Sequence, residues 1–108
     1  ITNQGGIAKG YYGVKEFINL QMYIKKKLSE HNIFINDFEY CPHHPYKILK
    51  KYKKICLCRK PNNLMIKRLF KKWNINKKMS FFIGDKNTDY LCAHKSKIKF
   101  IHYKNIYH

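Results

Sequence analysis

Long apolar runs are absent from this sequence of 108 residues. None approaches the roughly 20 consecutive apolar residues that a membrane-spanning helix needs, so we expect no membrane span and no membrane partner. The first residues do not resemble a secretory signal, and the reducing cytoplasm is the expected location. Internal repeats, low-complexity tracts and linkers are also absent, which favours one domain over a modular chain.

Arginine is scarce although the chain is strongly basic. The formal net charge is +17, yet only Arg59 and Arg68 among the 23 Lys and Arg residues are arginine. Proteins that read bases and phosphates rely heavily on bidentate arginine. Alanine is scarce too, and Ile, Asn and Tyr are abundant, which is the mix that an AT-rich coding sequence imposes. We therefore interpret the charge mainly as a solvated lysine surface, with a polyanion-binding groove as the alternative, and do not expect nucleic acid as a partner.

The apolar residues that are present follow alternating helix and strand patterns. Helical spacing predicts helices at 15–30, around 65–73 and at 88–95, and short apolar runs predict strands at 38–41, 80–83 and 98–101. Strands that alternate with helices in this way form a parallel sheet. The sequence therefore predicts an α/β fold, with one parallel sheet flanked by helices and one modest core.

Three of the four cysteines fall in one short pattern with a histidine. Cys41, His43, Cys56 and Cys58 form C-x-H-x(12)-C-x-C, and the loop 42–58 has little apolar pattern of its own. Two short pairs separated by a loop close easily around tetrahedral zinc, and four protein ligands leave no open position, so the predicted zinc is structural. Ordinary buried thiols with a surface histidine are the alternative. Disulfides are a weaker one, and Cys92 is expected in the core.

Polar residues follow the predicted strands at the edge where parallel sheets bind ligands. Thr2 and Asn3 lie where a preceding strand would end, Asp85 and Lys86 follow the strand at 80–83, and Arg59 and Lys60 follow the last cysteine of the pattern directly. Together these residues offer a hydroxyl, cations and a carboxylate suited to a hard metal ion. The set predicts a site for phosphate and Mg²⁺.

Four segments, in order along the chain, match one known family. They are Thr-Asn-Gln-Gly-Gly-Ile-Ala-Lys-Gly (2–10), Tyr-Cys-Pro-His-His-Pro (40–45), Cys-Leu-Cys-Arg-Lys-Pro (56–61) and Ile-Gly-Asp-Lys-Asn-Thr-Asp (83–89). They resemble the D,D-heptose 1,7-bisphosphate phosphatases of the haloacid dehalogenase superfamily. The related histidinol-phosphate phosphatases are the alternative; the His-His-Pro form of the loop and the lysine at position 86 argue against them.

This resemblance implies a fold, a reaction and a role for each matching residue. The fold is a Rossmann-like parallel sheet with a zinc loop at 41–58, and the reaction removes the 7-phosphate of D-glycero-D-manno-heptose 1,7-bisphosphate through an aspartyl-phosphate, on the route to ADP-heptose and lipopolysaccharide core. Zn²⁺ is structural, Mg²⁺ is catalytic, and a monomer is expected. The implied roles are phosphoryl binding by Thr2 and Asn3, a substrate loop at Gln4 and Gly5 (usually serine), recognition of the far end of the substrate by Arg59, charge neutralisation by Lys60, Mg²⁺ binding by Asp85, and phosphate binding by Lys86.

The family's nucleophile motif is missing from the sequence. The family begins with a strand followed by Asp-x-Asp-Gly-Thr, whereas no Asp-x-Asp occurs in residues 1–108. We therefore expect residues 1–108 to be a single partial domain, N-terminally incomplete, with unpaired strand edges and no phosphatase activity alone. A stand-alone basic zinc module that binds nucleic acid is the alternative from a different functional class.

Overall fold

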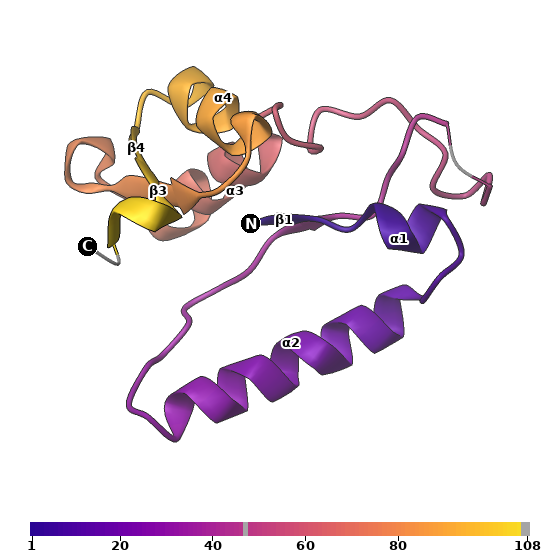
Figure 1. Cartoon of the computed structure of the whole chain (residues 1–108), viewed down its shortest axis with the longest axis horizontal. Helices are drawn as coiled ribbons and strands as arrows, with labels where there is room; N and C mark the ends of the chain where they lie inside the picture. The colour runs from indigo at the N-terminus through magenta and orange to yellow at the C-terminus, as the bar shows by residue number, and fades with distance from the viewer. Residues whose placement is uncertain (47, 107–108) are drawn as a thin grey trace. The chain divides into compact units, whose positions relative to one another are not determined.

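The computed structural model describes residues 1–46 and 48–106. By its contacts the chain divides into two compact units, which are Asn3–Ile55 and Ile1–Thr2 together with the chain from Cys56 onward. The elements, in order, are β1 (Thr2–Asn3), α1 (Gly5–Ala8), α2 (Val14–Ser29), β2 (Tyr40–Cys41), α3 (Leu64–Trp73), η1 (Lys77–Met79), β3 (Phe81–Gly84), α4 (Asn87–Lys95), β4 (Lys99–His102) and η2 (Tyr103–Ile106) (Figure 1).

The helix predicted at 15–30 is confirmed as α2, with a shift of one residue. At its start the Gly13 amide donates to the Glu16 carboxylate at 3.0 Å, which satisfies a backbone donor that the helix cannot. Lys26 and Lys27 occupy the last turn, where cations favour the negative end of the helix dipole. Phe17 is the buried residue of α2, and its ring packs against Tyr40 with centroids 4.8 Å apart.

The strand predicted at 38–41 is shorter in the structure. Only Tyr40 and Cys41 form β2, which pairs with β1. The Asp37 carboxylate accepts the Phe38 amide at 2.8 Å. Because this local bond engages an amide that a strand ladder would need, it accounts for the late start of the strand.

The glycine pair near the start of the chain lies in a short helix, α1, that the sequence analysis does not predict. A Cβ on Gly6 would lie 2.5 Å from the Tyr12 ring, so only glycine allows this ring to pack here. Ile7 and Ala8 of α1 are fully buried. The need for glycine at position 6 thus comes from internal packing.

The second unit contains the predicted helix and strand alternation from α3 to β4. Strands β3 and β4 are parallel, with Phe81 opposite Lys99 and Gly84 opposite His102. The predicted helices at 65–73 and 88–95 are confirmed as α3 and α4 to within one residue at each end. Their buried side chains include Met65 and Cys92, both fully enclosed, which confirms Cys92 as a core residue.

The strands of the described residues form two separate pairs, β1 with β2 and β3 with β4. The prediction of one continuous sheet through 38–41, 80–83 and 98–101 is therefore corrected. Parallel sheets are normally covered on both faces, yet Phe81 and Ile83 of β3 are 57% and 48% exposed. Among the described residues β4 is the only strand that pairs with β3.

No helix in the described parts of the chain is both long enough and apolar enough to cross a membrane.

Candidate functional site

The two short pairs of the Cys/His pattern are each preformed. The Cys41 sulfur lies 3.6 Å from Nδ1 of His43, and the sulfurs of Cys56 and Cys58 lie 3.2 Å apart. The Arg59 amide donates to the Cys56 sulfur at 3.3 Å. An amide that donates to a thiolate favours the charged form that binds metal. The chain that leads to Lys60 is therefore fixed to the second pair.

The four side chains of the pattern gather in one cluster, as the sequence predicts. Their ligand atoms all lie within 4.8 Å of one another. A tetrahedron with Zn–S bonds of about 2.3 Å has edges of about 3.8 Å, so the cluster fits a zinc ion with small movements. None of the four cysteines is in a disulfide. Cys92 is outside the cluster: its thiol donates to the Asn62 carbonyl at 3.3 Å, and burial raises its pKa.

Lys60 forms a buried ion pair with Asp89, a residue to which the sequence analysis assigns no role. The Lys60 ammonium lies 2.5 Å from the Asp89 carboxylate, and the two side chains are only 13% and 5% exposed. Buried charges are tolerated when they are paired and hydrogen-bonded. The pair therefore fixes the position of the cation that the sequence predicts at the phosphate site.

Asp89 also binds the loop that carries two other predicted site residues. Its second carboxylate oxygen accepts the amides of Asp85 at 3.2 Å and Lys86 at 3.1 Å. Burial alone raises the pKa of Asp89, but the bonds from Lys60 and these amides outweigh it, so the pKa lies below its ordinary value. One carboxylate thus holds together Lys60, Asp85 and Lys86.

A sequence signal for Asp89 does exist. Lys86 is the N-cap residue of α4 and Asp89 is its third helical residue, where an acidic side chain commonly bonds back to the cap amide. The close approach also requires Gly84, because a Cβ there would lie 2.6 Å from the Asp89 Cβ. Glycine at the end of an apolar strand and an acid five residues later would together have pointed to this residue.

The segment that follows the Cys/His cluster docks along one face of α4. Beside the Lys60–Asp89 pair, the Asn62 carbonyl accepts from Cys92, and the Asn63 amide group donates to the Ser96 hydroxyl at 3.2 Å. Residues 89, 92 and 96 of a helix share one face because their spacing is three and four. This face therefore holds the connection between the last cysteine and α3.

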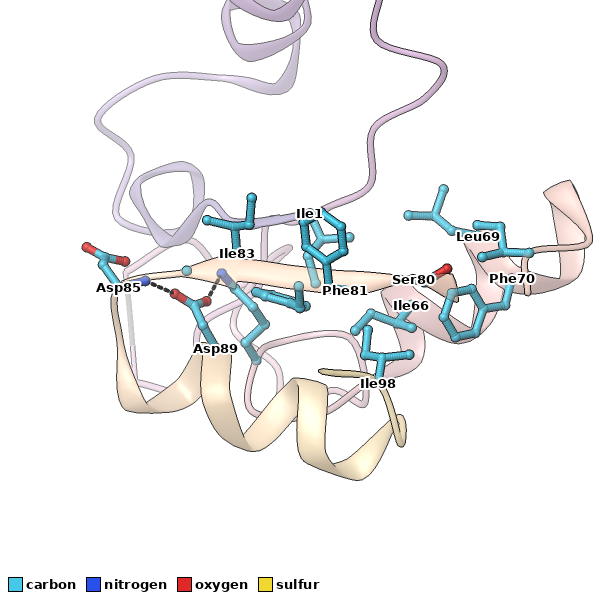
Figure 2. Close-up of a pocket in the computed structure, with 14 residues that line it drawn as sticks. Ile1, Ile66, Leu69, Phe70, Ser80, Phe81, Ile83, Asp85, Asp89 and Ile98 are labelled. Atoms are coloured by element: carbon cyan, nitrogen blue, oxygen red, sulfur yellow. Dashed lines mark hydrogen bonds and ion pairs between the residues drawn. The ribbon is translucent and has the colours of Figure 1, made fainter. Parts of the chain in front are cut away.

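A groove with an apolar part and a polar end runs along β3. Its volume is about 530 Å³. Figure 2 shows Ile66, Leu69 and Phe70 toward one end and Asp85 with Asp89 at the other. Lys60 also lines the groove. The polar end coincides with the carboxyl end of β3, which is where α/β proteins bind ligands.

The predicted site residues at the start of the chain lie in and directly after β1. Thr2 and Asn3 form this strand, Gln4 is the N-cap of α1, and Gly5 is its first residue. The Gln4 amide donates to the Cys41 carbonyl at 2.7 Å, and its side-chain carbonyl accepts from Tyr12. Gln4 is thus bonded through its backbone to a residue of the Cys/His cluster.

Comparisons with known proteins agree with the family that the four segments suggest. Residues 57–105 match a model of HAD-hydrolase-like proteins. Over 89 residues the chain is 44% identical to a D-glycero-alpha-D-manno-heptose-1,7-bisphosphate 7-phosphatase of Photorhabdus laumondii, covering 82% of this chain and 49% of that protein. Over 98 residues it is 37% identical to a D-glycero-beta-D-manno-heptose-1,7-bisphosphate 7-phosphatase of the same organism, covering 91% of this chain and 52% of that protein.

Two solved structures share the fold. A HAD-like phosphatase from Mesorhizobium loti superposes with a TM-score of 0.84 at 26% identity, over 91% of this chain and 47% of that one. The D,D-heptose 1,7-bisphosphate phosphatase of B. bronchiseptica, a complex with magnesium and phosphate, gives 0.78 at 20% identity, over 91% of this chain and 51% of that one. The chain thus has the fold of part of a HAD-like phosphatase.

The resemblance inferred from the sequence is confirmed as a partial match to the HAD-like heptose-1,7-bisphosphate 7-phosphatases. The chain spans about half the length of the curated relatives it matches.

Proposed function

We propose, from its partial match to the heptose-1,7-bisphosphate 7-phosphatases, that this chain forms one part of the catalytic domain of such an enzyme. The reaction is hydrolysis of the 7-phosphate of D-glycero-D-manno-heptose 1,7-bisphosphate, in the synthesis of ADP-heptose for lipopolysaccharide. We further propose a cytoplasmic monomer in which residues 1–108 form a single partial domain. The observation that carries the proposal is the carboxylate of Asp89, which binds Lys60 and the loop of Asp85 and Lys86 together.

The cations in this arrangement suit a transferring phosphoryl group. The Asp89 carboxylate orients the Lys60 ammonium. This ammonium neutralises the negative charge that develops on the phosphoryl oxygens in the transition state. Lys86, at the N-terminus of α4, adds a second charge beside helix amides that favour anions. Thr2 and Asn3 hold the same phosphoryl group through hydroxyl and amide donors. Arg59 binds the far end of the substrate. Gln4 and Gly5 form part of the loop that lines the substrate site.

Asp85 fits a Mg²⁺ ion as a single carboxylate ligand. Mg²⁺ is usually held by one or two carboxylates together with substrate phosphate and water. The second nearby carboxylate, Asp89, is directed at Lys60 and two amides, so we assign ion binding to Asp85 alone. When bound, the ion polarises the phosphoryl group.

The zinc proposed at Cys41, His43, Cys56 and Cys58 has a structural role. Four protein ligands leave no position for water or substrate. Arg59 and Lys60 follow the last ligand directly, and the Arg59 amide already bonds to the Cys56 sulfur. Zinc held by these four residues would therefore order the segment that carries Arg59 and Lys60.

The nucleophile of the proposed reaction is an aspartate of an Asp-x-Asp motif, which residues 1–108 do not contain. The apolar groove along β3, with Ile83 48% exposed beside Asp85, suits a further apolar strand that ends at the polar site. We propose that the strand with the nucleophile occupies it.

A chimera tests the proposed function. Residues 1–108 replace the matching half of the Photorhabdus D-glycero-alpha-D-manno-heptose-1,7-bisphosphate 7-phosphatase, and release of phosphate from heptose 1,7-bisphosphate is measured with Mg²⁺ present. We expect activity in the chimera, none in residues 1–108 alone, and a loss of at least about a hundredfold in kcat for Lys60→Met and Asp85→Asn. Lys99→Met, which removes a lysine on an exposed strand residue, is the matched control.

The proposal is contradicted if the folded chimera hydrolyses no sugar phosphate although it binds zinc. Preference for histidinol phosphate over the heptose substrate would favour the related family. Strong, salt-dependent binding of RNA by residues 1–108 without sugar-phosphate binding would favour a basic zinc module.

A further inference from the structure

Two side chains at the carboxyl end of β4, His102 and Tyr103, have no role in the site described above. His102 lies opposite Gly84 in the parallel pair, so the chain leaves β4 at the same edge at which Asp85 follows β3. This edge is where ligands of parallel sheets bind. Residues here are therefore candidates for contact with the part of a ligand that extends beyond Asp85.

A small second cavity lies at this edge. It has a volume of about 240 Å³ and is lined by Ile83, Gly84, Asp85 and Tyr103. The first three of these residues also line the larger groove, so both cavities adjoin Asp85. Sites that enclose a whole small molecule usually measure about 300–1,000 Å³. The smaller cavity suits one portion of a larger ligand.

Tyr103 presents an apolar ring face and a hydroxyl to this cavity, and His102 packs beside the Tyr103 ring. Tyr103 is 41% exposed. The centroids of the Tyr103 and His102 rings lie 5.1 Å apart, and the ring planes are tilted by 31°. Nδ1 of His102 accepts the Lys104 amide at 3.2 Å, so in the neutral ring the proton is on Nε2, which is a donor. A flat ring that bears a hydroxyl, beside an imidazole donor, matches a sugar, whose C–H faces are apolar and whose hydroxyls accept hydrogen bonds.

We propose that Tyr103, held in place by His102, contacts the carbohydrate body of the substrate and contributes to its selection. The inference rests on the proposed function, because the phosphoryl group bound at Asp85 places the sugar next to the cavity. Tyr103 makes no contact with the reacting atoms. Its loss therefore weakens binding of the sugar and leaves the chemistry of phosphoryl transfer unchanged.

Binding to residues 1–108 gives the first test. Because residues 1–108 lack the Asp-x-Asp motif, they should bind heptose 1,7-bisphosphate without hydrolysing it, and its affinity is measured by calorimetry with Mg²⁺ and Zn²⁺ present, beside that of inorganic phosphate. We expect Tyr103→Ala to weaken binding of heptose 1,7-bisphosphate by about tenfold and to leave the affinity for inorganic phosphate within twofold. Tyr103→Phe keeps the ring and removes only the hydroxyl. It should therefore fold even if the alanine variant fails to, and it should give a smaller loss of affinity.

Kinetics of the chimera give the second test. We expect Tyr103→Ala to raise KM for heptose 1,7-bisphosphate by about tenfold at an unchanged kcat, with no change for p-nitrophenyl phosphate, which has no sugar. Tyr90→Ala is the matched control, because Tyr90 is similarly exposed at 47% and lines neither cavity.

Equal losses of kcat/KM for heptose 1,7-bisphosphate and for p-nitrophenyl phosphate would overturn the inference, since Tyr103 would then act through Asp85. An unchanged KM in both Tyr103 variants would overturn it as well. A parent chimera that hydrolyses p-nitrophenyl phosphate but no heptose bisphosphate would instead contradict the proposed function.

Discussion

At the scale of single residues, the Asp89 carboxylate is the decisive group. The Asp89 side chain is 5% exposed, and its carboxylate accepts one ammonium and two amides. A buried cation that loses its partner is costly, because the unpaired charge stays out of water. The same side chain therefore matters for stability as well as for the geometry of the site.

The first prediction concerns this pair. Asp89→Asn should lower the free energy of unfolding by about 3 kcal/mol, because it leaves Lys60 buried without a counter-charge. Urea denaturation followed by circular dichroism measures the change. The double variant Lys60→Met, Asp89→Asn should recover part of the loss, since neither charge remains and the asparagine oxygen still accepts the amides of Asp85 and Lys86.

An exposed ion pair of the same chain supplies the control. Lys27 and Glu30 lie 3.7 Å apart with side chains 53% and 50% exposed. Glu30→Gln should change stability by less than about 1 kcal/mol. Equal effects of Asp89→Asn and Glu30→Gln would show that burial does not strengthen the Lys60–Asp89 pair.

At the scale of elements, the junction between β3 and α4 brings the site residues together. Gly84 ends β3, and the space that a side chain would need is filled by Asp89. The sequence predicts both elements, because their apolar periodicity is local. It does not predict that Lys60 bonds to α4, because this contact joins residues 29 positions apart.

The second prediction follows from this close approach. Gly84→Ala should cost about 1–3 kcal/mol and displace Asp89, because the new Cβ would lie 2.6 Å from the Asp89 Cβ. The change is measured by thermal unfolding, and by kcat in the chimera, which should fall in parallel.

Gly13→Ala is the matched substitution. Its Cβ would lie 2.7 Å from a carboxylate oxygen of Glu16, but this side chain is exposed and turns away easily. We expect a change below about 1 kcal/mol. A cost as large as that of Gly84→Ala would mean that crowding by Asp89 is not the cause.

At the scale of the whole molecule, the proposed zinc ion at the Cys/His cluster would order a long loop. The third prediction is one zinc per chain by mass spectrometry of the metal, with its loss in Cys56→Ser and Cys58→Ser. Cys92→Ser is the control and should keep its zinc, because Cys92 lies in the core away from the cluster. Loss of zinc in Cys92→Ser but not in Cys58→Ser would show that the zinc does not bind at the Cys/His cluster.

The fourth prediction separates a structural from a catalytic zinc. In the chimera, Cys58→Ser should lower kcat/KM, because Arg59 and Lys60 lose their ordered approach. Added Mg²⁺ should not restore activity, and the pH profile of the residual rate should keep its shape. Full activity after complete removal of zinc would exclude this role.

The sequence by itself determined helices α2, α3 and α4, the parallel pair β3 and β4, and the Cys/His cluster, because their signals lie in apolar spacing and in Cys/His pairs two residues apart. Tertiary structure alone decided the role of Asp89, the packing that requires Gly6, and the position of Tyr103 beside Asp85. These depend on contacts between residues far apart in the chain. Such contacts follow from how the elements pack, which no local pattern records.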